Sequence, residues 1–181
     1  VMNHYMFQLD LDWGYPPALW EDLIPVVRQW TQSLPGAREV VVDGFALATA
    51  VDFAPDGRIF IAEKGGVVRV VKNGTLLPTP VIALTDVNSF GDRGLLGLAV
   101  DPDFETNGYL YLSYTYENTP GLNIAGPKTG RIVRVTVVGD TADELTKVVL
   151  VGTVPGDATN PSCENFAVTV DCIPSDSNSH S

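Results

Sequence analysis

The chain has 181 residues, of which 45% are hydrophobic, and its 22 acidic residues outnumber 11 basic ones, giving a formal charge of −11. This composition is typical of a folded domain with a sizeable core and argues against disorder. The absence of a Lys/Arg run argues against binding to nucleic acid or an anionic membrane surface, and no apolar run reaches the roughly 18 residues of a membrane span.

Residues 1–38 differ from the rest of the chain, and we expect them to form a short helical extension. Apolar residues recur there at helical spacing, at Leu19, Leu23, Val26, Val27 and Trp30. Pro25 interrupts the pattern, which predicts one kinked helix or two short turns. This segment carries no recognisable chemistry.

From Glu39 onward the periodicity changes to that of β-strands. Asp56-Gly57, Gly65-Gly66 and Asn73-Gly74 are hairpin turn signals, because these residues accept a positive φ at low cost. The pattern predicts antiparallel meanders without βαβ units. The expected strands are 39–44, 48–54, 58–63, 67–72, 80–85, 95–101, 109–116, 131–138 and 147–154.

One supersecondary unit is written twice between Phe53 and Tyr116. Pro55, in the turn Ala-Pro-Asp-Gly, corresponds to Pro102, in the turn Asp-Pro-Asp-Phe, about 47 residues later. That period, with about four strands per unit, is typical of propeller blades, which bury their faces only by stacking. The sequence therefore predicts an all-β fold in which 39–155 form two four-stranded antiparallel blades, and two blades do not close a ring.

Two polar stretches follow the strands: a long loop at 117–130 and an irregular tail at 156–181, which contains Cys163 and Cys172. A disulfide between these cysteines would close a short loop, contribute about 2–3 kcal/mol in the chain-entropy model, and imply an oxidising compartment. Two free thiols are the alternative. A zinc site is the weakest option, because two Cys and one nearby His fall short of a ligand set. We favour the disulfide.

Two segments, Phe-Ala-Pro-Asp-Gly-Arg-Ile-Phe-Ile-Ala-Glu-Lys-Gly-Gly (53–66) and Gly-Asp-Arg-Gly-Leu-Leu-Gly-Leu-Ala-Val-Asp-Pro-Asp-Phe (91–104), resemble the soluble glucose/sorbosone dehydrogenases, also called aldose sugar dehydrogenases. Residues 107–115 and 130–135 continue the match in order. The resemblance implies a six-bladed propeller that uses pyrroloquinoline quinone (PQQ) and calcium to oxidise an aldose or related sugar to its lactone. It also implies an extracellular or periplasmic location.

The chain would then be the N-terminal portion of such a propeller, ending in an irregular loop that leads to a third blade. We expect this portion to be inactive and to bind neither PQQ nor calcium by itself, because the family's Arg, Lys and backbone ligands come from later blades. Its partners would be those remaining blades, and a sugar as substrate of the complete protein. Neither the sugar nor the electron acceptor can be read from the sequence.

The resemblance carries over two site residues. His180 matches the catalytic base, which takes the proton from the anomeric hydroxyl of the sugar; imidazole suits this role because its pKa of about 6.5 leaves it basic near neutral pH. Asp92 matches a position, Gln or Glu in other members, that faces the cofactor. Ser179 departs from the Asp that precedes the base in proven sugar oxidases; it can hydrogen-bond to the imidazole but cannot stabilise its charge.

Each of these residues also has an interpretation without a functional role. His180 could be a solvated tail residue, Asp92 a turn residue paired with Arg93, and the Asp101/Asp103 pair a turn cap rather than calcium ligands; we assign no metal ligand in this chain. The rival function is a non-catalytic secreted propeller for binding or scaffolding, which Ser179 favours. Asn73-Gly74-Thr75 is an N-glycosylation sequon, meaningful in a secreted eukaryotic protein.

Overall fold

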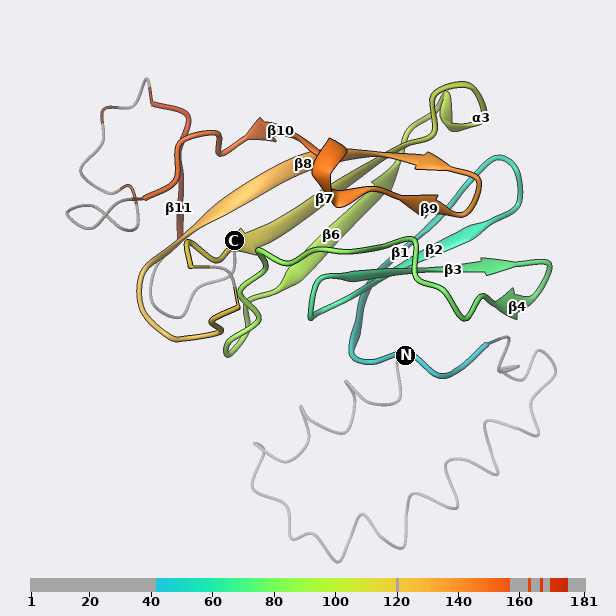
Figure 1. Ribbon diagram of the computed structural model, residues 1–181, viewed down its shortest axis with the longest axis horizontal. Helices are drawn as coiled ribbons and strands as arrows, with labels where there is room; N and C mark the ends of the chain where they lie inside the picture. Colours follow the sequence, from blue (N-terminus) through green and yellow to red (C-terminus); the bar gives the residue numbers. More distant parts are fainter. Residues whose placement is uncertain (1–41, 120, 157–162, 164–166, 168–169, 176–181) are drawn as a thin grey trace, which may run out of the picture. The chain divides into compact units, whose positions relative to one another are not determined.

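The computed structural model describes residues 42–119, 121–156, 163, 167 and 170–175 (Figure 1). The expected extension at 1–38 lies outside these residues, as do Ser179 and His180. Within the described part of the chain the fold is mostly β and consists of two antiparallel sheets, which confirms the prediction of a partial propeller. No helix in this part is long and apolar enough to cross a membrane.

The first sheet is a meander of four strands in chain order, with a short fifth strand paired to the third. The predicted turns connect them: the backbone closes between Ala54 and Arg58 with an N–O distance of 2.9 Å, and Asn73 and Gly74 both have positive φ, at 51° and 74°. The strands are β1 (Ala48–Phe53), β2 (Ile59–Glu63), β3 (Val67–Lys72), β4 (Thr75–Leu76) and β5 (Ile82–Ala83).

The second sheet repeats this arrangement in the order β6-β7-β8-β10, and the short strands β9 and β11 also pair with β8 (Figure 1). Its strands are β6 (Leu95–Val100), β7 (Tyr109–Tyr116), β8 (Lys128–Val138), β9 (Thr141–Ala142), β10 (Val148–Val151) and β11 (Ile173–Ser175). Two short helical turns interrupt it, α3 (Phe104–Asn107) and the 3-10 turn η2 (Glu144–Thr146).

The internal repeat is real, since β1 and β6 begin 47 residues apart and occupy equivalent positions in the two sheets. The copies differ in the first turn, where the second contains α3. The Asp101 carboxylate caps this turn: it accepts hydrogen bonds from the Asp103 amide (2.9 Å), Asn107 Nδ2 (2.8 Å) and the Tyr111 hydroxyl (2.6 Å). Bonds from Tyr111, Asn107 and the Asp103 amide lower the pKa of Asp101, so capping is the role that the structure shows.

The core lies between the two sheets and is built from alternate residues of their strands, as the two-residue period of a strand requires. Val81, Ile82 and Leu84, in and beside the short strand β5, complete the core. The fully buried or nearly buried members are Phe60, Ala62, Val68, Val70, Val81, Ile82, Leu84, Leu95, Phe104, Leu110, Leu112, Tyr114, Val133 and Val135.

Polar side chains also join the first strands of the two sheets. Asp52 Oδ2 accepts from the Val100 amide at 2.7 Å, and Thr49 Oγ1 donates to the Leu95 carbonyl at 2.6 Å. β1 and β6 therefore lie side by side, as the innermost strands of adjacent blades would.

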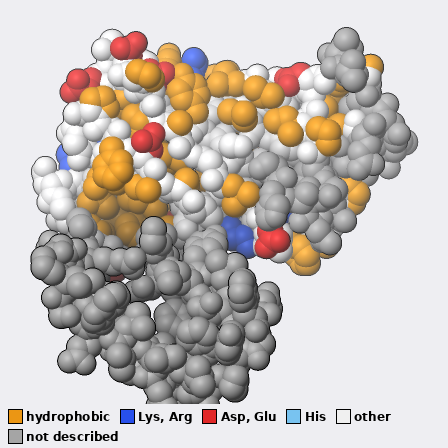
Figure 2. Space-filling view, turned by 180° about the vertical axis from the view of Figure 1, so that it is seen from behind, with side chains coloured by type: hydrophobic (Ala, Val, Ile, Leu, Met, Phe, Trp, Pro, Cys, Tyr) orange, Lys and Arg blue, Asp and Glu red, His pale blue; other side chains and the backbone are white. Residues whose placement is uncertain are grey.

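Two sequence expectations need correction. Residues 42–44, the described part of the strand expected at 39–44, form no strand, and Gly44, with φ of 91°, ends any extended run. β8 begins at Lys128 rather than at 131, because β7 and β11 both pair with its first residues. The large exposed apolar residues of the strands are Val51, Phe53, Val138, Val148, Leu150 and Val151. Figure 2 shows hydrophobic side chains gathered on part of the rear face of the described residues.

Candidate functional site

One end of both sheets gathers the loops that surround the candidate site; we call it the loop end. Because neighbouring strands are antiparallel, β2 ends where β3 starts, and the start of β6, the end of β7 and the start of β8 likewise share one end. The Leu95 amide donates to the Lys64 carbonyl at 3.0 Å, which places the β2–β3 turn beside the start of β6. The described residues at the loop end are therefore 64–66, 84–94, 117–119, 121–127 and 152–156.

Asp92 lies at the loop end, in an exposed turn of the 84–94 loop. Two glycines near it are held against the first sheet: Lys64 Nζ donates to the Gly91 carbonyl, and a Cβ at Gly94 would lie 2.6 Å from the Lys64 carbonyl oxygen. Only glycine permits that approach. The fold thus presents the Asp92 carboxylate to solvent on a turn whose base is fixed.

Buried polar residues are concentrated beneath this loop. The Glu117 carboxylate, 1% exposed, accepts from Lys128 Nζ (2.9 Å), Asn88 Nδ2 (2.6 Å) and the Thr119 amide (3.2 Å). Burial raises the pKa of Glu117, but the bonds from Lys128, Asn88 and Thr119 outweigh it and leave the pKa below its ordinary value. The group remains an ionised, fully partnered anchor. The other buried polar residues here are Asp86, Arg93, Thr115 and Thr129.

Asn88 and its neighbour join the 84–94 loop to the 117–127 loop. Asn88 Nδ2 also donates to the Ile124 carbonyl at 2.9 Å, the Ser89 amide donates to Asn123 Oδ1 at 2.9 Å, and Asn123 Nδ2 returns a bond to Ser89 Oγ at 3.2 Å. The apolar side chains of Phe90, Leu122 and Ile124 are exposed on these joined loops. The loop end therefore offers a carboxylate and apolar side chains on one supported surface.

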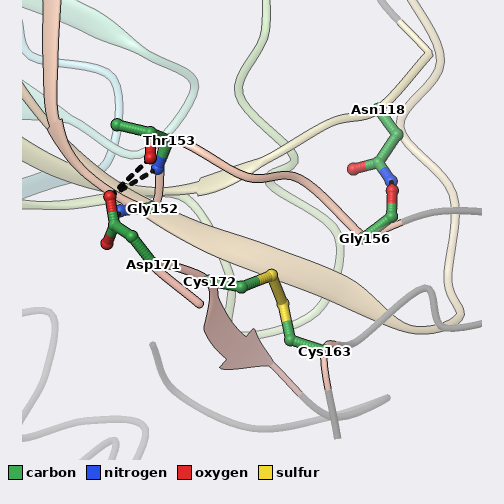
Figure 3. Close-up of a disulfide and its surroundings, with 7 residues drawn as sticks. All are labelled: Asn118, Gly152, Thr153, Gly156, Cys163, Asp171 and Cys172. Carbon is green, nitrogen blue, oxygen red and sulfur yellow. Dashed lines mark hydrogen bonds between the residues drawn. A yellow bond between two sulfur atoms is a disulfide. The ribbon is translucent and has the colours of Figure 1, made fainter. Parts of the chain in front are cut away.

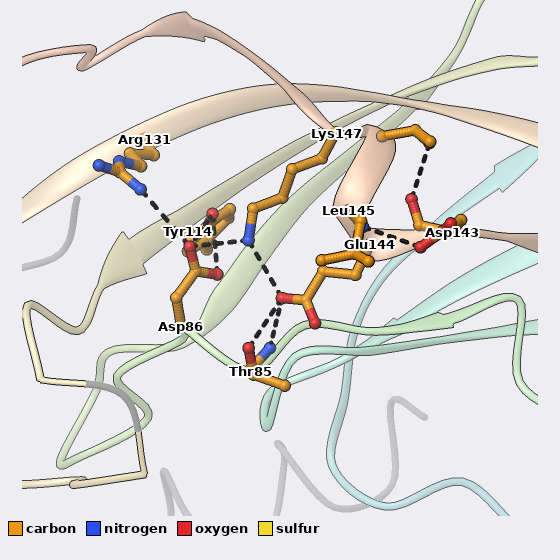
Figure 4. A network of polar contacts seen from close by, with 9 residues as sticks. Thr85, Asp86, Tyr114, Arg131, Asp143, Glu144, Leu145 and Lys147 are labelled. Atoms are coloured by element: carbon orange, nitrogen blue, oxygen red, sulfur yellow. Dashed lines mark hydrogen bonds and ion pairs between the residues drawn. The ribbon is translucent and has the colours of Figure 1, made fainter.

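A second polar network anchors the beginning of the same loop (Figure 4). The Asp86 carboxylate contacts Lys147 Nζ at 2.8 Å, the Tyr114 hydroxyl at 3.1 Å and Arg131 Nη1 at 3.4 Å. Lys147 continues to Glu144, at 3.0 Å. Glu144 Oε1 in turn accepts from the amide (2.8 Å) and the hydroxyl (3.0 Å) of the residue before Asp86, so η2 and the 84–94 loop are tied together.

This network is suited to holding the loop rather than to proton transfer. Burial, together with the charge of Asp86 and its hydrogen bond, raises the pKa of Tyr114 far above its ordinary value, so the phenol stays protonated. Burial raises the pKa of Glu144, but the hydrogen bonds from Thr85 and Lys147 outweigh this effect. The pKa therefore lies below its ordinary value. Both groups thus keep one protonation state near neutral pH.

The disulfide predicted from the sequence is present, between Cys163 and Cys172, whose Cα atoms are 5.9 Å apart (Figure 3). Asp171, the residue before Cys172, is bonded to the chain that follows β10. Its carboxylate accepts hydrogen bonds from the Gly152 amide (2.9 Å) and from the Thr153 amide (3.1 Å) and hydroxyl (2.6 Å). β11 follows directly and pairs with the start of β8. The described chain therefore reaches Ser175 at the loop end, five residues before His180.

The described residues contain too few ligand groups to bind a quinone or a calcium ion by themselves. In this part of the chain no group of three or more His, Cys, Asp or Glu side chains could hold a metal ion. Asp92 supplies one exposed carboxylate and Lys64 one cation beside it, which is no ligand set for a tricarboxylate such as PQQ. His180 lies outside the described residues, so the expectation that it shares a site with Asp92 stays a prediction.

Comparisons with known proteins agree with this architecture. The glucose/sorbosone dehydrogenase family model matches residues 45–162. Quinoprotein glucose dehydrogenase B of Acinetobacter calcoaceticus is 30% identical over 115 residues, covering 62% of this chain and 24% of that protein. Hedgehog-interacting protein of Homo sapiens is 35% identical over 83 residues, covering 41% and 12%. A crystal structure described as an oxidoreductase (glucose dehydrogenase) from Thermus thermophilus superposes with a TM-score of 0.53 at 29% identity, covering 67% and 34%.

Proposed function

The chain belongs to the glucose/sorbosone dehydrogenase family, and on this premise we propose that it supplies two blades of a propeller that oxidises an aldose or related sugar to its lactone. The observation that carries the proposal is the family match over 45–162, which includes every strand but β11 and the loop that exposes Asp92. The chain spans 24% of the quinoprotein and 34% of the Thermus structure, so the activity is proposed for a protein with the complete propeller. The two blades alone are expected to be inactive.

In this proposal the other blades would hold PQQ and calcium, and the bound quinone would supply the hydride acceptor. His180 takes the proton from the anomeric hydroxyl oxygen of the sugar. Ser179 orients the imidazole by a hydrogen bond without adding charge. Asp92, on its fixed turn, forms one wall of the pocket and accepts hydrogen bonds from groups that enter it. An extracellular or periplasmic location is part of the proposal, and the Cys163–Cys172 disulfide supports it.

The test is sugar oxidation by the full-length protein after reconstitution with PQQ and calcium. His180→Asn should lower turnover by about 10²–10⁴-fold, the usual effect of losing a positioned general base, while the absorbance titration with PQQ stays nearly unchanged. His4→Asn, at the only other histidine of the chain, is the matched control and should keep full turnover. Ser179→Asp should raise the rate, because a carboxylate would stabilise the imidazolium as it forms. Unchanged turnover in His180→Asn would place the base elsewhere.

A second candidate function is a secreted propeller that binds a partner without catalysis. It is favoured by the similarity to Hedgehog-interacting protein, which shows that related blades occur in a protein named for an interaction, and by Ser179. The same experiment separates the two. A folded full-length protein that neither binds PQQ nor oxidises any aldose would support the binding module over the enzyme.

A further inference from the structure

The sequon Asn73-Gly74-Thr75 forms the tip of the β3–β4 hairpin, and its geometry is that of an accessible surface turn. Lys72 pairs with Thr75, so the connection consists of Asn73 and Gly74 alone. Their φ values, 51° and 74°, are those that a two-residue hairpin turn needs and that Asn-Gly tolerates. All three sequon residues are exposed, and the Asn73 side chain makes no hydrogen bond to any residue that the structure describes.

We propose that Asn73 is an acceptor for an N-linked glycan. The motif has the required Thr two positions after Asn and a middle residue other than Pro. It is the only such motif among the 181 residues, because Asn160-Pro161-Ser162 has Pro in the middle position. The donor is a lipid-linked oligosaccharide pyrophosphate: Asn73 Nδ2 forms a bond to C1 of the first sugar, the bond from C1 to the pyrophosphate oxygen breaks, Nδ2 loses one proton, and the lipid pyrophosphate leaves.

The folded chain has room for a glycan at this position. A Cβ placed on Gly74 would meet no atom within 4 Å, so the surroundings of the turn are open. The nearest cation, Lys72, is directed toward Asp140, with its Nζ 2.9 Å from the carboxylate. A glycan at the hairpin tip would therefore displace no packed side chain among the residues that the structure describes.

The position also leaves the candidate site free. β3 starts at the loop end, beside the 64–66 turn, and runs away from it, so Asn73 lies at the opposite end of the first sheet from Asp92. The compartment is consistent as well, because N-linked transfer takes place where disulfides form, and Cys163 and Cys172 are bonded. The inference stands whether the complete protein is an enzyme or a binding module.

The experiment is secretion of the chain from eukaryotic cells, followed by intact mass measurement before and after peptide N-glycosidase F. The wild type should lose the mass of one glycan. The deglycosylated protein should then contain Asp in place of Asn73. Thr75→Ala should be secreted without the glycan, whereas Thr75→Ser, which preserves the motif, should keep it. Thr75 is preferred to Asn73 for these variants because the αL conformation of Asn73 contributes to the turn.

Two results would overturn the proposal. One is a secreted, disulfide-bonded wild type in which Asn73 is entirely unmodified. The other is a glycan that persists in Thr75→Ala, which would place the modification at another residue.

Discussion

Replacing Lys128 with Met tests whether the buried ion pair under the loop end is needed for stability. Lys128 and Glu117 flank the 117–127 loop, and their side chains are 8% and 1% exposed, with Nζ and Oε1 2.9 Å apart. Met has nearly the same length as Lys but no charge. The substitution therefore leaves the Glu117 carboxylate buried, with Asn88 and the Thr119 amide as its remaining hydrogen-bond donors.

The expected loss follows from this geometry. Removing one partner of a buried ion pair destabilises a protein by about 3–5 kcal/mol. Because Glu117 keeps two donors, we expect the lower end, about 3 kcal/mol, out of the roughly 5–15 kcal/mol that stabilises a typical domain. With a urea slope of about 2 kcal/mol/M, the unfolding midpoint should fall by about 1.5 M.

Urea unfolding followed by circular dichroism at neutral pH provides the measurement. The matched control is Lys72→Met: Lys72 also forms an ion pair, with Asp140 at 2.9 Å, but its side chain is 46% exposed, so the loss should stay below about 1 kcal/mol. The double variant Glu117→Gln/Lys128→Met should recover part of the stability, since neither position then carries a buried charge. A midpoint for Lys128→Met no lower than that of Lys72→Met would refute the reasoning.

The pH dependence of the same variants gives a second check. In the wild type the lowered pKa of Glu117 adds stability above its unfolded value of about 4.3, and this is lost as the pH falls through the folded pKa. In Lys128→Met burial remains while the main lowering contact is gone, so the pKa of Glu117 should rise. The folded variant would then bind more protons than the unfolded chain, and its deficit should shrink as the pH is lowered from 7 toward 5.

Three further predictions concern the fold. Gly108→Ala should destabilise more than Gly121→Ala in thermal unfolding: both glycines have positive φ, but only at Gly108 would the new Cβ meet an atom, the Val137 carbonyl oxygen at 2.4 Å. Mass spectrometry with and without reductant should show Cys163 and Cys172 bonded, and labelling of both as free thiols in protein isolated without reductant would contradict this. The isolated chain should self-associate at micromolar concentration through the exposed apolar residues of β1 and β10, as measured by sedimentation; a cooperative monomer melting above ~60 °C would argue against it.

The strands and turns could be predicted because their signals are local. Alternating apolar residues such as Leu110 and Leu112 mark the buried face of a strand, and Asn73-Gly74 marks a hairpin within two positions of itself. The repeat and the disulfide also depend on spacing along the chain. The prediction of a strand at 39–44 was wrong for residues 42–44. Gly44 has a positive φ there, which the apolar pattern around it does not indicate.

The anchors of the candidate site could not be predicted in the same way. Asn88 and Glu117 are 29 residues apart, and Asp86 and Lys147 are farther apart still, so neither pair has a spacing that any local period would select. The sequence contained one usable hint: Glu117 directly follows a predicted strand, where a side chain can reach back over the sheet end. Asp92 was identified by family resemblance alone, and its exposed turn gives no other signal of function.

The side chains that anchor the 84–94 loop are polar, and this leaves Asp92 exposed. A loop packed down by apolar side chains would bury its tip, whereas hydrogen bonds to Asp86 and Asn88 hold the base of the 84–94 loop and leave Asp92 in solvent. The anchoring contacts and the exposed turn are therefore separate features of the loop end. A substitution at Asp92 removes none of the hydrogen bonds and ion pairs made by Asp86 and Asn88, so the loop should keep its position while its exposed charge changes.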